Sequence, residues 1–125
     1  MKILDSSVII SIFRKQEKNH KKALKIFTSD QKFLIPEYVI TEVLTVLKMR
    51  EGLNTANKCY DFISNTKDIE IEPIENIVFN KALTYFSQNK NNLSFIDTIL
   101  LVLSKENQIE LISFDKDLEK AIKHS

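Results

Sequence analysis

The sequence predicts an α/β fold of Rossmann-like type, in which a parallel sheet of four to five strands is flanked by about seven helices in three layers. Short apolar runs alternate with longer segments whose apolar residues recur at helical spacing, the pattern of a parallel sheet with crossover helices. Gly occurs once and Pro twice, too rarely for a β-sandwich built on tight turns. With 125 residues and neither repeat nor linker, the chain is expected to form one domain, residues 1–125.

Each strand is predicted from a short apolar run, and each helix from a periodic segment near it. Pro36 suits the first turn of the third helix, and Gly52 stops that helix. Alternation and Pro73 place the third strand near a sheet edge. The strands are expected at residues 1–4, 33–35, 69–73 and 110–114. The helices are expected at about residues 8–13, 20–29, 37–51, 54–64, 75–88, 93–106 and 115–123.

Composition excludes several classes of protein. Cys59 is alone, so no intrachain disulfide forms, and it has no zinc-site spacing with the two histidines. A reducing, cytoplasmic setting is therefore expected. Asp5 interrupts the first apolar run, which argues against a signal sequence, and the apolar stretch at 95–103 is too short to span a bilayer. With a net charge of +1, any nucleic-acid binding must depend on local patches.

Four acids stand out by their predicted positions. Asp5 and Asp115 each follow a strand directly, where ligands bind in parallel α/β sheets. Glu42 and Asp97 interrupt apolar helix faces, with no Lys or Arg three or four residues away to neutralise them. If the four converge, carboxylates without His or Cys suit Mg²⁺ or Mn²⁺. The alternatives are that Asp5 and Asp115 only cap helices and that Glu42 pairs with a distant Lys.

Over nearly its whole length, the chain resembles the PIN-domain family, and within it the VapC-type toxins. Ile3–Ile9 is similar to the first motif of that family, an Asp followed by Ser or Thr at the end of the first strand. Ile35–Val43 resembles the second motif, a helix after a Pro-bearing loop that presents a Glu. Leu93–Ile99 resembles the third, an acid early in a helix, and Ile112–Leu118 the fourth, a Thr/Ser-x-Asp turn after a strand.

The resemblance implies a metal-dependent endoribonuclease that is the toxin of a type II toxin–antitoxin system. A metal-activated water would hydrolyse a phosphodiester of RNA, such as tRNA or rRNA, leaving a 3′-hydroxyl and a 5′-phosphate. By position, Ser6 and Ser113 would supply hydroxyls to the site, and Asp117 would be an outer acid. The implied ligands of Mg²⁺ or Mn²⁺ are Asp5, Glu42, Asp97 and Asp115.

The resemblance also implies partners: a homodimer, and an antitoxin that holds the enzyme inactive. Two departures from the family pattern are visible. Ser113 stands where Thr is commoner, which keeps the hydroxyl. The family usually has a further strand after the last helix, and this sequence stops at Ser125, so the sheet is expected to lack one edge strand. That departure concerns the dimer surface and not the acids.

A basic cluster is the candidate for phosphate contacts with RNA. The alternative is an ordinary solvated helix face in a Lys-rich chain. Its members proposed for RNA binding are Lys18, Lys21, Lys22 and Lys25.

Two other functions compete with the nuclease. A haloacid-dehalogenase-like phosphatase also begins with an Asp after its first strand, but it needs a second Asp two positions on, where this chain has Ser7. The other is a non-catalytic PIN-like module that binds RNA or a partner; loss of one or more acids would favour it, and all four are present.

Overall fold

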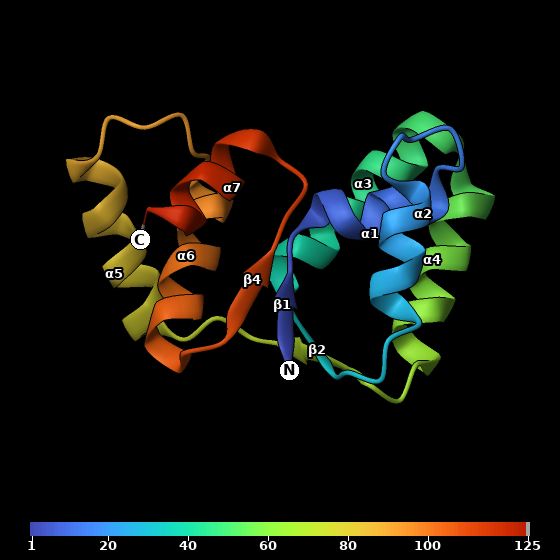
Figure 1. Cartoon of the computed structure of the whole chain (residues 1–125), viewed down its shortest axis with the longest axis horizontal. Coiled ribbons are helices and arrows are strands. Elements are labelled where there is room, and N and C mark those ends of the chain that lie inside the picture. The colour runs from blue at the N-terminus through green and yellow to red at the C-terminus, as the bar shows by residue number, and fades with distance from the viewer. Residues whose placement is uncertain (125) are drawn as a thin grey trace.

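Four parallel strands form the centre of the molecule, in the spatial order β3-β2-β1-β4 (Figure 1). The computed structural model describes residues 1–124. The strands are β1 (Lys2–Leu4), β2 (Phe33–Pro36), β3 (Ile69–Glu72) and β4 (Glu110–Ile112). The predicted parallel α/β fold is confirmed, with four strands in the described range, and β3 does lie at an edge.

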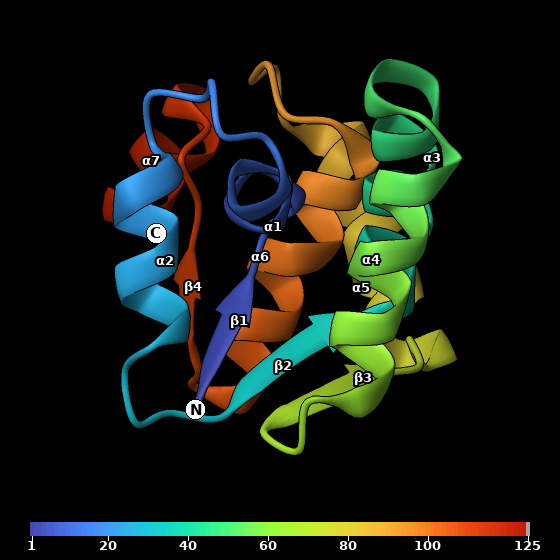
Figure 2. The ribbon, with the colours of Figure 1, turned by 90° about the vertical axis from the view of Figure 1, so that its right-hand side faces the viewer.

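Helices cover both faces of this sheet. Going from β1 through β2 to β3, the chain moves one way across the sheet, so right-handed crossovers put the intervening helices on one face; the return to β4 puts the next two on the other. Figure 2 looks onto the first face, with α2 and α4 in front of the strands. The helices are α1 (Ser6–Phe13), α2 (His20–Phe27), α3 (Glu37–Glu51), α4 (Leu53–Asn65), α5 (Asn76–Gln88), α6 (Phe95–Asn107) and α7 (Lys116–Lys123).

The strands differ in sequence because they differ in position. Every residue of β2, an inner strand covered on both faces, is buried, and its sequence is apolar throughout. Edge strand β3 alternates Ile and Glu and has no fully buried residue. Side chains of the inner strands pack against the helices as one main core, with a smaller cluster between α5 and α6 around Ala82 and Ile99.

The ends of α3 follow from two residues that the sequence singles out. Pro36 is the last residue of β2 and the N-cap of α3, where its missing N–H costs nothing. Gly52 ends α3 with a φ of 102°, in the region that favours glycine. The predicted bounds of this helix, 37–51, are confirmed. None of the helices described for residues 1–124 has the length and apolar character needed to cross a bilayer.

Candidate active site

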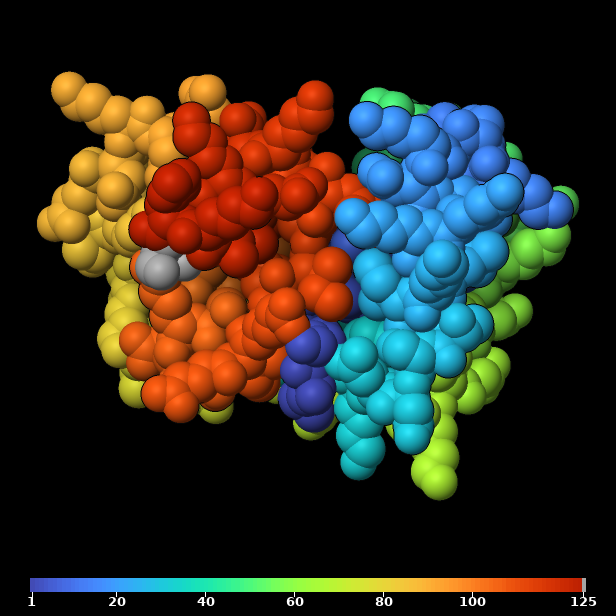
Figure 3. Space-filling model, in the orientation of Figure 1, coloured from blue at the N-terminus to red at the C-terminus, as the bar shows by residue number. Residues whose placement is uncertain are grey.

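Asp5 and the segment around Ser113 meet because β1 and β4 are neighbours. Leu4 pairs with Ile112, and the Asp5 backbone N–H donates to the Ile112 carbonyl at 3.0 Å. Parallel strands have their carboxyl ends at one edge, so the residues after both strands emerge together. Figure 3 shows the surface hollowed at this end, between the N-terminal and C-terminal parts of the chain.

The Asp5 carboxylate is buried, with 3% of the residue exposed, and it is held by hydroxyl groups. Ser7 Oγ and Ser113 Oγ each donate to Asp5 Oδ2 at 2.8 Å. Ser6 Oγ donates more weakly to Oδ1, at 3.4 Å. Asp5 occupies the N-cap position of α1, yet its side chain makes no capping hydrogen bond. A helix cap therefore does not explain this residue, whose Oδ1 is the less occupied of its two oxygens.

Ser7 links the two strand ends, although the sequence pattern does not single it out as a site residue. Besides donating to Asp5, its hydroxyl accepts the Phe114 backbone N–H at 3.0 Å, and its Oγ lies 3.4 Å from Ser113 Oγ. The Ser113 hydroxyl in turn accepts the Asp115 backbone N–H at 3.0 Å. The only sequence signal for Ser7 was its place in the first helical turn after Asp5. Its role depends on contacts with residues more than a hundred positions away.

Asp97 lies in the first turn of α6 and forms a capping box with Ser94. The Ser94 hydroxyl accepts the Asp97 backbone N–H, and the Asp97 carboxylate accepts the Ser94 backbone N–H, each at 3.1 Å. The sequence pattern indicates an acid within an apolar helix face; the position of Asp97 in the first turn of the helix gives it two polar partners. The pKa of its carboxyl is raised from 3.8 to about 6. Burial is the main cause and the charges of Asp5 and Asp115 add to it, while the hydrogen bonds with Ser94 act in the opposite direction.

Asp115 is both a helix cap and a neighbour of the other acids. Its Oδ1 accepts the Leu118 backbone N–H at 3.0 Å, so the capping role predicted as an alternative is real. Its charge nevertheless contributes to raising the pKa of the Asp97 carboxyl, so the two carboxylates are within electrostatic reach of each other. Asp5, Asp97 and Asp115 thus come from three separate segments to one end of the sheet.

Glu42 lines an open cleft of about 410 Å³ that begins at this cluster. From α3 it shares the cleft walls with Ser6, Ser7 and Asp115. The predicted alternative, an ion pair with a distant Lys, is absent: no salt bridge found within residues 1–124 involves Glu42. Farther along, two cations line the same cleft, Arg14 and Arg50.

The remaining predicted residues lie in different surroundings. Asp117 lines a separate cavity, described below, although it is only two residues after Asp115. Lys22 lies with its Nζ 5.4 Å from the centre of the Phe114 ring, and Phe114 lines the cleft. The other three lysines proposed for RNA contact are exposed on α2 or the loop before it: Lys18, Lys21 and Lys25.

A divalent cation fits this site by its donor chemistry. The converging groups are carboxylate and hydroxyl oxygens, which Mg²⁺ and Mn²⁺ prefer. No salt bridge in the described part of the chain neutralises Asp5, Glu42, Asp97 or Asp115. Within the same range, no three His, Cys, Asp or Glu side chains are already gathered around one metal position. Beyond the effect of burial, the charges of Asp5 and Asp115 contribute to the raised pKa of Asp97, so a bound cation would relieve this repulsion and favour a closer arrangement.

Comparison with known proteins identifies the class. The family model described as PIN domain matches residues 2–123, so the chain belongs to the PIN-domain family. The predicted family is confirmed.

Two solved structures share the fold. The VapC20 toxin of Mycobacterium tuberculosis, described as cleaving the sarcin–ricin loop, superposes with a TM-score of 0.88 at 17% sequence identity, over 97% of this chain and 95% of that chain. A toxin–antitoxin complex from Klebsiella pneumoniae gives a TM-score of 0.70 at 19% identity, over 94% of this chain and 89% of that chain. No curated protein matches the sequence.

Proposed function

We propose that the protein is a metal-dependent endoribonuclease and the toxin of a type II toxin–antitoxin system. The observation that carries the proposal is that Asp97 lies within electrostatic reach of Asp5 and Asp115 in a PIN-domain fold, where Asp115 and Glu42 line the same cleft. The likeness in fold to a toxin described as cleaving the sarcin–ricin loop supports RNA as the substrate class.

The acids and the serines beside them have different parts in this proposal. Asp5, Glu42, Asp97 and Asp115 would hold Mg²⁺ or Mn²⁺, which when bound supplies activation of water and neutralisation of charge on the phosphodiester. Ser7 and Ser113 keep the Asp5 carboxylate in one orientation through their 2.8 Å hydrogen bonds. Ser94 does the same for Asp97 through the capping box. Fixed carboxylates need little rearrangement to bind a cation, which favours its binding.

Basic residues beside the acids support RNA binding. Arg14 and Arg50 line the cleft, and Lys22 lies over Phe114 at its edge. Arg14 is engaged by Glu17 and Glu51, whereas Arg50 has no ion pair among the described residues. Arg50 and Lys22 are therefore the cations we propose for phosphate contacts. Regulation by an antitoxin is proposed from the second structural relative, a toxin–antitoxin complex, and a homodimer from the family resemblance.

The test is cleavage of RNA by the purified protein with Mg²⁺, with Mn²⁺ and with EDTA. Asp5→Asn and Asp97→Asn should each lower the rate by roughly a hundredfold or more, since loss of even the outer partners of metal ligands lowers activity about 10- to 100-fold. Asp61→Asn is the matched control, because Asp61 is exposed on α4 and makes no interaction with the cluster. Undiminished cleavage by either folded site variant would contradict the assignment.

The biological role needs a second experiment. Induction of the protein in cells, followed by sequencing of RNA 5′ ends, should show new ends that depend on Asp5. Growth arrest should be relieved by co-expression of the neighbouring gene. If new RNA ends appear but no adjacent gene relieves the growth arrest, the proposed nuclease activity stands and the proposed toxin–antitoxin role is wrong.

A further inference from the structure

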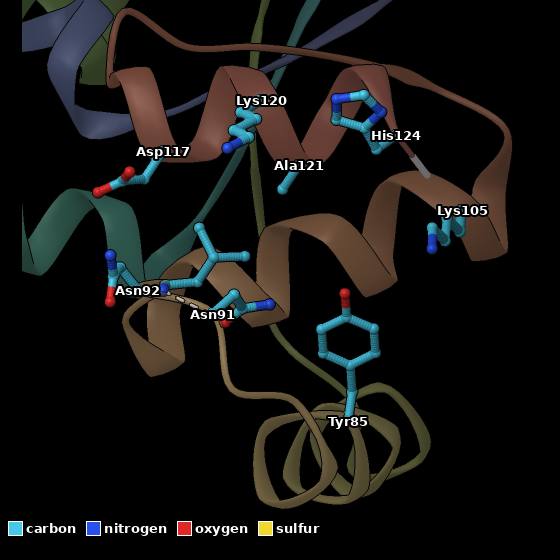
Figure 4. A pocket seen from close by; sticks show the side chains of 9 residues that line it. Tyr85, Asn91, Asn92, Lys105, Asp117, Lys120, Ala121 and His124 are labelled. Atoms are coloured by element: carbon cyan, nitrogen blue, oxygen red, sulfur yellow. Dashed lines mark hydrogen bonds between the residues drawn. The ribbon is translucent and has the colours of Figure 1, made fainter.

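A second cavity, of about 370 Å³, is separate from the cleft that contains Glu42 and includes Asp117, in the first turn of α7, in its lining (Figure 4). Four segments enclose it: the end of α5, the loop before α6, the last turn of α6, and α7. In Figure 4 Tyr85 and Asn91 approach from one wall and Ala121 from the opposite wall. Its volume is in the range of pockets that bind small organic ligands. The lining residues are Tyr85, Asn91, Asn92, Leu93, Lys105, Asp117, Lys120, Ala121 and His124.

The lining combines cations with one aromatic ring. The cations Lys105 and Lys120 take part in no salt bridge found within residues 1–124, and Asp117 is the single acid among the lining residues, which also include His124. The Lys105 Nζ lies 5.8 Å from the centre of the Tyr85 ring. Unpaired cations favour an anionic ligand, and an accessible ring next to them favours a flat one. A nucleotide has both features.

The cavity is joined to the acids by two short stretches of chain. Asp117 follows the cap residue Asp115 by two positions, which is about 3 Å of helix rise. On the opposite wall, Leu93 precedes Ser94 of the Asp97 capping box directly. Residues within two positions of Asp115 and within four of Asp97 therefore line this cavity, and Asp115 itself lines the cleft. A single strand of RNA crossing the acids would meet the cavity next.

We propose that this cavity binds one nucleotide of the RNA substrate beside the scissile phosphate, with Tyr85 against the base and with Lys105 and Lys120 near phosphate oxygens. The assignment rests on the proposed ribonuclease function. Asn91 and Asn92 offer amide groups at the base edge; the Asn91 Oδ1 already accepts the Leu93 backbone N–H at 3.3 Å, while its NH₂ group remains a donor. The cavity would thus contribute to selection of the nucleotide next to the cut.

Binding is measured by fluorescence anisotropy with a labelled single-stranded RNA of random sequence, about ten nucleotides long, on full-length protein carrying Asp97→Asn to prevent cleavage. Tyr85→Ala should weaken binding by roughly fivefold to a hundredfold, the range expected for loss of one base stack. Lys120→Gln should reduce the slope of log affinity against log salt by about 0.7, the value for one phosphate contact with a single strand. Tyr60→Ala and Lys67→Gln are the matched controls, because both residues are exposed on or after α4.

A second readout does not depend on cleavage. Nucleoside monophosphates added to ¹⁵N-labelled wild-type protein should shift amide resonances of residues 91–93 and 117–124, and Tyr85→Ala should remove those shifts. RNA affinity and salt slope equal to those of the controls, with no such shifts, would overturn the cavity assignment. If Asp5→Asn still abolishes cleavage in that case, the proposed function stands without it. Shifts at the cavity in a protein that never cleaves RNA would instead overturn the proposed function and keep the nucleotide site.

The same variants separate RNA from a protein partner. If Tyr85→Ala and Lys120→Gln leave RNA affinity unchanged and instead prevent relief of toxicity by a co-expressed antitoxin, the cavity serves the antitoxin and the nucleotide assignment is wrong.

Discussion

Replacing Asp97 by Asn should stabilise the metal-free protein at neutral pH while removing its activity. The carboxyl has a pKa of about 6 in the folded chain against 3.8 ordinarily, mainly because of burial. That rise corresponds to roughly 3 kcal/mol of destabilisation when the group is ionised, at ~1.36 kcal/mol per pKa unit. Because Asp97 is only partly buried, solvent screening reduces the expected gain to about 1–2 kcal/mol. Asn keeps the hydrogen bond to the Ser94 N–H without the charge.

The pH dependence follows from the direction of the shift. Below about pH 4 the carboxyl is neutral in both folded and unfolded chains, so wild type and Asp97→Asn should be equally stable. Between about pH 4 and 6 the unfolded chain loses the proton first, so the wild type loses stability as pH rises. Above about pH 6 the full difference is present.

Thermal unfolding followed by circular dichroism in EDTA, from pH 4 to 8, measures this difference. For 125 residues a gain of 1 kcal/mol raises Tm by about 4 °C, so the variant should melt about 4–8 °C higher at pH 7.5. Mg²⁺ should then stabilise the wild type more than the variant. A variant that melts at or below the wild-type temperature at pH 7.5, or a difference that does not change with pH, would refute the reasoning. Asp61→Asn, on the exposed surface of α4, is the control.

Three further outcomes are expected. Ser113→Ala should destabilise the fold by about 1–3 kcal/mol in urea unfolding, because the buried Asp5 carboxylate and the Asp115 N–H each lose a partner; Ser113→Thr, which keeps a hydroxyl, should lose less, and equal losses would argue against the hydrogen-bond explanation. Cys59 should react with a soluble thiol reagent at pH 8 only after unfolding, since burial raises the pKa of its thiol to about 12; rapid reaction of the folded chain would contradict its burial. Leu100→Ala should cost about 2–5 kcal/mol in the same urea assay, because Leu100 is fully buried in the main core; a loss below about 1 kcal/mol would show that the core closes around the gap.

The sequence was sufficient for the fold class, and it nominated the four acids, which stay a prediction. β2 is apolar throughout because both of its faces are covered, and β3 alternates Ile and Glu because it lies at an edge. Such patterns can be read from a few neighbouring residues. Glu42 and Asp97 were predicted as site acids because a carboxylate is unusual on an apolar helix face. Asp5 was predicted because it directly follows a buried strand. Gly52 marked the end of α3 because its backbone has a positive φ.

What the sequence left open are contacts between distant segments. Whether Asp5 and Asp115 are caps or site acids depended on what their side chains touch: Asp115 caps α7, and Asp5 does not cap α1. Asp97 proved to be part of a capping box as well as a neighbour of the other acids.

The tertiary structure alone decided how Asp5 is held and where the second cavity lies. Ser7 and Ser113 reach one carboxylate oxygen because α5 and α6 return the chain to pair β4 with β1, which brings together residues 106 and 108 positions apart. Patterning of apolar residues specifies each element through its neighbours three or four positions away, but such a pairing depends on the register of two strands and on the packing of the helices between them. For that reason the sequence could nominate four acids and the Ser6 and Ser113 hydroxyls as candidates. It could not show that Ser7 helps to hold Asp5, or that Arg14 and Arg50 line the cleft.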